Sequence, residues 1–157
     1  MKRVLLISAI SVLSGSLLSP SPAKAQLLPP AARAARVQIT QGPELELANG
    51  YLTIIRWTTN NPGGSDEHFG VVQYGTDPKH LNATAKSHIR LNRGHSYAVF
   101  RVRLNALKPK TTYYYRVTSI ESNGKSDGEE SAVNRFTTPG LGEVIAASSP
   151  LPVPQSR

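Results

Sequence analysis

The sequence contains no cysteine, one methionine and one tryptophan among its 157 residues. The absence of cysteine excludes disulfide bridges, thiolate zinc sites and a cysteine nucleophile. Small exported domains often depend on disulfides, so a cysteine-free one must be stabilised by packing alone. Acidic residues are also scarce, because 10 acidic against 18 basic side chains give a formal net charge of +8. An apolar content of 39% is too low for a protein with several membrane spans.

Residues 1–25 have the pattern of an export signal. Lys2 and Arg3 precede an uncharged apolar stretch over 4–18, and Ala23-Lys24-Ala25 provides the small-x-small site that signal peptidase accepts. An apolar stretch of about 15 residues is shorter than the roughly 20 that a transmembrane helix needs. We predict cleavage before Gln26 and a secreted or periplasmic product with no membrane span after cleavage. An uncleaved N-terminal anchor is the alternative.

The remaining chain divides into a short linker, one domain and a tail. Residues 26–35 are rich in Pro and Ala, and residues 140–157 carry Pro150, Pro152 and Pro154 among Ser and Ala, which predicts a disordered tail. No sustained helical periodicity occurs between them. About seven short apolar or alternating runs are instead separated by Gly, Pro and Asn turn signals. They lie at 37–39, 51–57, 69–74, 84–91, 97–104, 112–120 and 131–137. This pattern predicts an all-β, seven-stranded immunoglobulin-like sandwich over 36–139.

Two features predict how this sandwich is held together. Trp57 is the largest apolar side chain and should fill the core between the sheets. Residues 97–104 alternate, with Phe100 among the inward side chains and Arg101 among the outward ones. Tyr113 begins the next run after a turn containing Pro109, so its hydroxyl should bond to a backbone group upstream, as in the tyrosine corner of such sandwiches.

These motifs resemble those of a fibronectin type III domain over 36–139, and more closely those of the domain that precedes the catalytic domain of purple acid phosphatases. The residues that carry the resemblance are Trp57, Val72, Tyr74, Gly75, Leu107, Pro109, Thr111, Tyr113, Tyr115, Val117, Phe136, Thr137 and Thr138. The resemblance implies the fold and is nearly silent on function. In the phosphatases a downstream domain holds the two metals, and here only a Pro-rich tail follows residue 139. We therefore expect that phosphatase activity does not carry over.

The residues offer little support for catalysis. None of the four histidines, His68, His80, His88 and His95, has a tight metal-ligand spacing, and solvated loop histidines are the default reading. A paired site of His88 with His95 is an alternative. No G-x-S-x-G motif occurs. We predict a chain that is not an enzyme and that needs no metal and no cofactor. A weaker alternative is calcium bound by the acidic loops through Asp66, Asp127 and Glu130, which lack the alternating-oxygen pattern of a calcium loop.

Basic residues are concentrated in one stretch. Residues 78–120 contain no acidic residue and nine basic ones. Arg101 and Arg103 should share an outward face, with Arg90 beside them on the preceding strand, which makes these three the candidate anion-binding residues. Lys108 and Lys110 should lie at one end of the sandwich and the acidic loops at the other, so the molecule should be electrically polarised. Basic side chains that only protect exposed strand edges and maintain solubility are the alternative.

The sequence therefore predicts a secreted, non-catalytic fibronectin type III module that acts by binding or spacing. Its partner would be a protein or an anionic polysaccharide or envelope ligand. Nucleic acid is not expected, because export and the lack of exposed aromatic platforms argue against it. The alternative function is an accessory or detached relative of the phosphatase N-terminal domain that works with a separate metallophosphoesterase.

Overall fold

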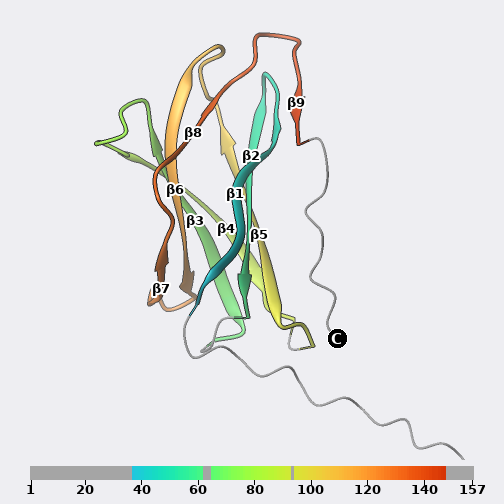
Figure 1. Cartoon of the computed structure of the whole chain (residues 1–157), viewed down its shortest axis with the longest axis vertical. Helices are drawn as coiled ribbons and strands as arrows, with labels where there is room; N and C mark the ends of the chain where they lie inside the picture. Colours follow the sequence, from blue (N-terminus) through green and yellow to red (C-terminus); the bar gives the residue numbers. More distant parts are fainter. Residues whose placement is uncertain (1–36, 62–64, 93, 148–157) are drawn as a thin grey trace, which may run out of the picture.

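The computed structural model describes residues 37–61, 65–92 and 94–147, which form two antiparallel sheets packed face to face (Figure 1). One sheet has the order β5-β2-β1-β9, and the other has the order β4-β3-β6-β7 with β8 also paired to β6. The strands are β1 (Ile39–Ala48), β2 (Leu52–Asn60), β3 (Glu67–Gly75), β4 (Ala83–Arg90), β5 (Tyr97–Asn105), β6 (Thr112–Glu121), β7 (Ser126–Glu130), β8 (Asn134–Thr137) and β9 (Ile145–Ala146). The predicted all-β sandwich is confirmed, with nine strands over the described residues in place of seven.

The structure has two strands more than predicted and a longer first strand. These differences occur where strand pairing has register shifts or joins segments far apart in the sequence. The predicted strand over 37–39 continues through Gly42 and Pro43 to Ala48, because three register shifts let β1 follow β2 past the interruption. Gly42 has φ 76°, and a Cβ there would lie 3.0 Å from the carbonyl oxygen of Arg56, so this position requires glycine. The last predicted run becomes β8, while β7 pairs with β6 inside a segment that was expected to be a loop.

The core lies between the sheets and is centred on Trp57, as predicted. Trp57 is fully buried and stacks on Phe100, with ring centroids 5.1 Å apart. On the facing sheet, a Cβ on Gly70 would lie 2.9 Å from both rings, so the glycine makes room for the stacked pair. The alternation of β5 and of β6 is confirmed, since every second side chain along each strand is buried.

The predicted tyrosine corner is also confirmed. The backbone N–H of Lys108 donates to the Tyr113 hydroxyl over 3.0 Å, and the Tyr113 ring stacks on Phe136 at 5.9 Å. Thr138 secures the same connection from the other side, because its hydroxyl donates to the Lys108 carbonyl over 2.6 Å and accepts from the Thr111 N–H over 2.9 Å. The β5–β6 connection is therefore held by hydrogen bonds both to Tyr113 at the start of β6 and to Thr138 just after β8.

The chain beyond Pro139 does not leave the domain at once. Gly140 is buried, the chain turns at 140–143, and Ile145 and Ala146 of β9 pair with Ala48 and Leu47 of β1. The structure thus places a strand inside the segment that the sequence assigned to a disordered tail. The rest of that tail, from 148 on, lies outside the described residues, as do the predicted signal over 1–25 and the linker over 26–35.

Candidate binding surface

The structure separates the three arginines that were predicted to form one anion-binding face. Arg101 and Arg103 share the outer face of β5, as expected. Arg90 lies on β4, which belongs to the other sheet, and its exposed side chain stands on that sheet's outer face in register with Glu67. The outer faces of a sandwich point in opposite directions, so Arg90 does not lie beside the other two. The connection between β4 and β5 crosses from one sheet to the other.

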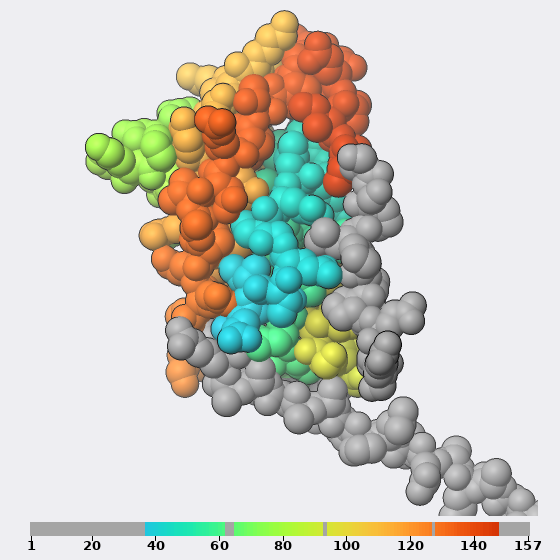
Figure 2. All heavy atoms as spheres, viewed as in Figure 1, coloured from blue at the N-terminus to red at the C-terminus, as the bar shows by residue number. Residues whose placement is uncertain are grey.

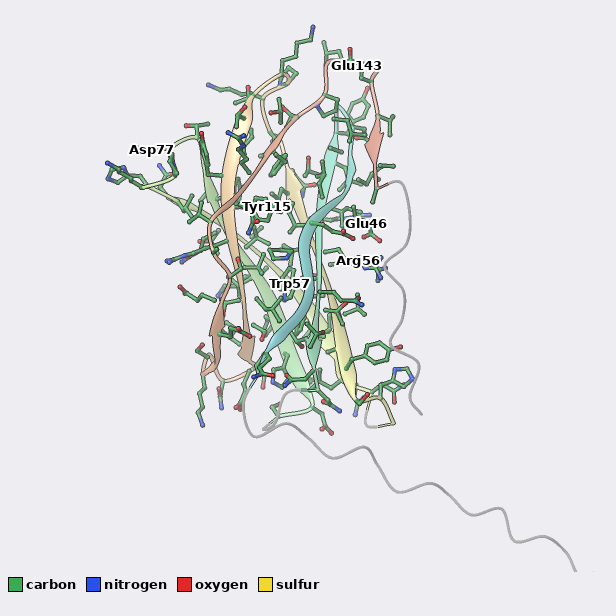
Figure 3. The ribbon with its side chains drawn as sticks, in the orientation of Figure 1. Glu46, Arg56, Trp57, Asp77, Tyr115 and Glu143 are labelled. Atoms are coloured by element: carbon green, nitrogen blue, oxygen red, sulfur yellow. The ribbon has the colours of Figure 1, made fainter. Side chains whose placement is uncertain are left out.

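Arg101 is already engaged by a carboxylate. Its Nε lies 3.0 and 2.9 Å from the two carboxylate oxygens of Glu46, and Arg56 Nη1 lies 3.9 Å from the same group. Figure 3 shows Glu46 and Arg56 on the β1–β2 side of the molecule. An anion at Arg101 would have to compete with Glu46, whereas no ion pair is found for Arg103 among the described residues. The sequence did not reveal this pairing, because Glu46 lies at the register shift between Leu45 and Leu47, on a strand that was predicted to end at residue 39.

The acidic and histidine side chains do not form a metal centre. Within 37–61, 65–92 and 94–147, no group of three His, Asp or Glu side chains has a metal-binding arrangement. Glu130, one of the proposed calcium ligands, is bound by Arg116 at 3.0 Å, and the Asp127 side chain lies outside what the structure describes. The acidic residues at 127–130 lie on β7 and not in a loop as expected. The Ser122 N–H donates to the Glu67 carbonyl over 3.0 Å, so the turn before β7 lies beside the start of β3, at the far end of β6 from Lys108 and Lys110.

The histidines have separate surroundings. His68 is fully buried in β3, which corrects the expectation of a solvated loop residue. His88 lies against the Phe69 ring, whereas His95 stacks on Tyr97 at 5.2 Å, so the two histidines of the alternative paired site have different partners.

His80 bonds to Asp77 in the β3–β4 connection, with Nδ1 and Oδ2 2.8 Å apart. This hydrogen bond, together with the one from the Lys79 N–H, lowers the pKa of the Asp77 carboxyl below its usual value. Both side chains are exposed, so the pair is a feature of the surface turn.

A different surface gathers the exposed apolar side chains. We define the loop-end surface as Tyr51, Lys108, Pro109, Lys110, Leu141, Val144 and Ile145, which come from three connections and the start of β9 at the same end of the sandwich. Among the described residues five large hydrophobic side chains are exposed, and four of them belong to this surface. Tyr51 is 91% exposed and Leu141 83%, so both project almost entirely into solvent. The fifth is Val133, between β7 and β8.

Local hydrogen bonds explain why these side chains point outward. The Asn49 side chain accepts from the N–H groups of Tyr51 and Leu52, both over 2.9 Å, which closes the β1–β2 turn with Tyr51 at its tip. In the turn after β8, the Gly140 N–H donates to the Glu143 carboxylate over 2.7 Å and fixes the segment that carries Leu141. A Cβ on Gly50 would lie 3.8 Å from Leu141 Cδ2, so the two turns are neighbours.

Basic side chains border this apolar end. Figure 2 shows the β5–β6 connection (light orange) and the segment after β8 (red) at the same end of the molecule. Between them lies an open hollow of about 400 Å³, lined by Pro109, Lys110, Gly140, Leu141 and Glu143. The Lys110 backbone has φ 47°, and its N–H donates to the Pro139 carbonyl over 3.3 Å. Sequence reasoning missed this surface, because it placed Tyr51 at the start of a strand and residues 141–145 in a tail.

None of the described residues belongs to a helix that could cross a membrane. No curated protein sequence matches the chain. Two solved structures of the sensor domain of the anti-sigma factor RsgI4 from Pseudobacteroides cellulosolvens are similar to it. One is 18% identical, covers 74% of this chain and 98% of its own, and has a TM-score of 0.42. The other, a solution structure, is 19% identical, covers 73% and 91%, and has a TM-score of 0.43.

A family match supports the resemblance seen in the sequence. Residues 45–138 match the N-terminal domain of purple acid phosphatases, which is a fibronectin type III-like, non-catalytic domain. The match begins within β1 and ends just after β8, so it covers the strands that form the sandwich apart from β9. Because it spans more than half of the 157 residues, the chain belongs to the family of the purple acid phosphatase N-terminal domain.

Proposed function

We propose that this chain is a secreted, non-catalytic binding module that contacts an anionic ligand of the cell envelope through the loop-end surface. The observation that carries the proposal is the concentration of exposed apolar side chains at one end, beside Lys108 and Lys110. Contiguous exposed apolar patches on small domains are often interaction sites. The predicted export signal and the non-catalytic nature of the family's domain support the location and the binding role.

The arginines contribute less than the sequence suggested. Arg103 is exposed two residues before the end of β5 and belongs to the basic border of this end. Arg101 is bound to Glu46, and Arg90 faces away on the other sheet. We therefore propose that Arg103, Lys108 and Lys110 supply the anion-binding charge.

The experiment is a pull-down of residues 26–157 against the envelope fraction of the source cells at low and high salt. We expect binding that weakens with salt and is lost in a Tyr51→Ser/Leu141→Ser variant. Val133→Ser is the matched control, because it removes an exposed apolar side chain away from the loop-end surface. Equal retention of the wild type and both variants would contradict the proposal.

The family match favours one second candidate, an accessory module that works with a separate metallophosphoesterase. A phosphoesterase from the same organism would then co-elute with residues 26–157 in size-exclusion chromatography and change its KM when the module is added. Independent elution and unchanged kinetics would contradict this function.

A further inference from the structure

We propose that the anionic ligand of the loop-end surface is a lipid bilayer. Tyr51, Leu141 and Val144 would enter the headgroup layer, while Lys108 and Lys110 contact lipid phosphates. The inference rests on the proposed function of the same surface and adds the class of its ligand.

The shape of the surface favours a bilayer over a folded partner. The apolar side chains project into solvent from two adjacent turns, and the hollow beside them is lined partly by Lys110 and Glu143. A stable protein interface requires complementary packing around its apolar centre. A fluid interface accepts projecting side chains of any arrangement, and tyrosine is enriched at the headgroup level of membranes.

The charge of this end selects anionic lipid. Lys108 and Lys110 are exposed, and neither ammonium group is ion-paired within the part of the chain that the structure describes. Glu143 is the acidic residue beside this surface. Its carboxylate accepts a hydrogen bond from the Gly140 N–H, next to the Lys110 side chain. In the neighbouring β3–β4 connection, Asp77 and Lys79 offset each other in charge. With Arg103, Lys108 and Lys110 against Glu143, this end of the sandwich has a net positive charge. Each basic residue near an anionic membrane raises the partition coefficient of a protein from water to the membrane by roughly fivefold.

The geometry also distinguishes this contact from an N-terminal anchor. The loop-end surface lies where β1 ends and β2 begins, and β1 itself begins at the opposite end of the sandwich (Figure 1). The apolar stretch over 4–18 comes before β1 in the sequence, so it leads into the domain at that opposite end. Binding through Tyr51 and Leu141 is therefore a property of the sandwich and is expected without residues 1–25.

The experiment is vesicle co-sedimentation of residues 26–157, a fragment that retains every member of the core cluster. The vesicles contain phosphatidylcholine alone or with about one third phosphatidylglycerol, at low and high salt. We expect binding to the anionic vesicles only. It should fall about tenfold in Tyr51→Ser/Leu141→Ser, through lost insertion, and more than tenfold in Lys108→Glu/Lys110→Glu, while Val133→Ser retains it. Thermal melts of all four proteins verify that each is folded.

Two results would overturn the bilayer as the ligand. One is no preference for the anionic vesicles, and the other is equal loss in the Tyr51/Leu141 variant and in the Val133 control. If vesicle binding fails but capture by the envelope fraction still depends on Tyr51 and Leu141, the ligand is a protein or polysaccharide and the proposed function stands. If neither vesicle binding nor envelope binding depends on these residues, both proposals fail.

Discussion

The Tyr113 hydroxyl is the single group whose removal tests the corner of the sandwich. Tyr113→Phe deletes the acceptor of the Lys108 N–H, a part-buried hydrogen bond of 3.0 Å, and keeps the ring that packs on Phe136 and Tyr74. A donor that loses its partner in such a site costs about 1–3 kcal/mol in unfolding free energy. For a domain of this size, a loss of about 2 kcal/mol lowers the Tm by roughly 8–12 °C.

Tyr114→Phe is the matched control for this prediction. Tyr114 is the next residue on β6 and points to the opposite face of the sheet, where it is partly exposed. We expect its variant to melt within about 0.5 kcal/mol of the wild type, as surface substitutions usually do. The measurement is chemical and thermal unfolding of both variants, followed by circular dichroism. Equal unfolding free energies for the two variants would refute the structural role of the Tyr113 hydroxyl.

Three further predictions concern the core, the Glu46 pair and a buried phenol. Gly70→Ala forces a Cβ into the stacked Trp57–Phe100 pair and should cost about 1–3 kcal/mol in urea unfolding, unlike Gly50→Ala, whose Cβ would meet its nearest neighbour at 3.8 Å. Glu46→Gln should change stability by less than about 1 kcal/mol, yet strengthen anion binding at Arg101 in salt-dependent titrations. Burial, with the Glu44 charge, raises the pKa of Tyr115 to about 12, so stability should fall from pH 10 towards 12 and should fall less in Tyr115→Phe; coincident pH profiles would contradict this.

The core and the corner could be predicted because their signals are local. Period-two alternation places Phe100 inside and Arg101 outside without knowledge of the neighbouring strands. Tyr113 follows its turn within a few residues, so its contact with Lys108 joins positions only five apart. Trp57 was predictable for a different reason, since a domain of this size has few other side chains large enough to fill the space between two sheets.

The binding surface could not be predicted in the same way. Alternation tells which face of its own sheet Arg90 occupies, but not which sheet contains β4. Glu46 meets Arg101 across 55 positions of sequence, and its own strand is interrupted by register shifts. The placement of Leu141 beside Gly50 depends on β9 returning to pair with β1. A two-residue strand that pairs with a strand almost one hundred residues earlier has almost no signature in sequence. It forms only because the folded sheet offers it an edge with which to pair.

The central claim, that the loop-end surface enters an anionic bilayer, is tested most directly by placing a fluorophore on that surface. Trp57 is the single native tryptophan and is fully buried, so its emission should not respond to a ligand. Tyr51→Trp places a second indole at the tip of the β1–β2 turn, and Val133→Trp places one at the other exposed apolar site. On addition of phosphatidylglycerol vesicles, we expect a blue shift in Tyr51→Trp and none in Val133→Trp. An unchanged Tyr51→Trp spectrum, or equal shifts at both positions, would contradict the account.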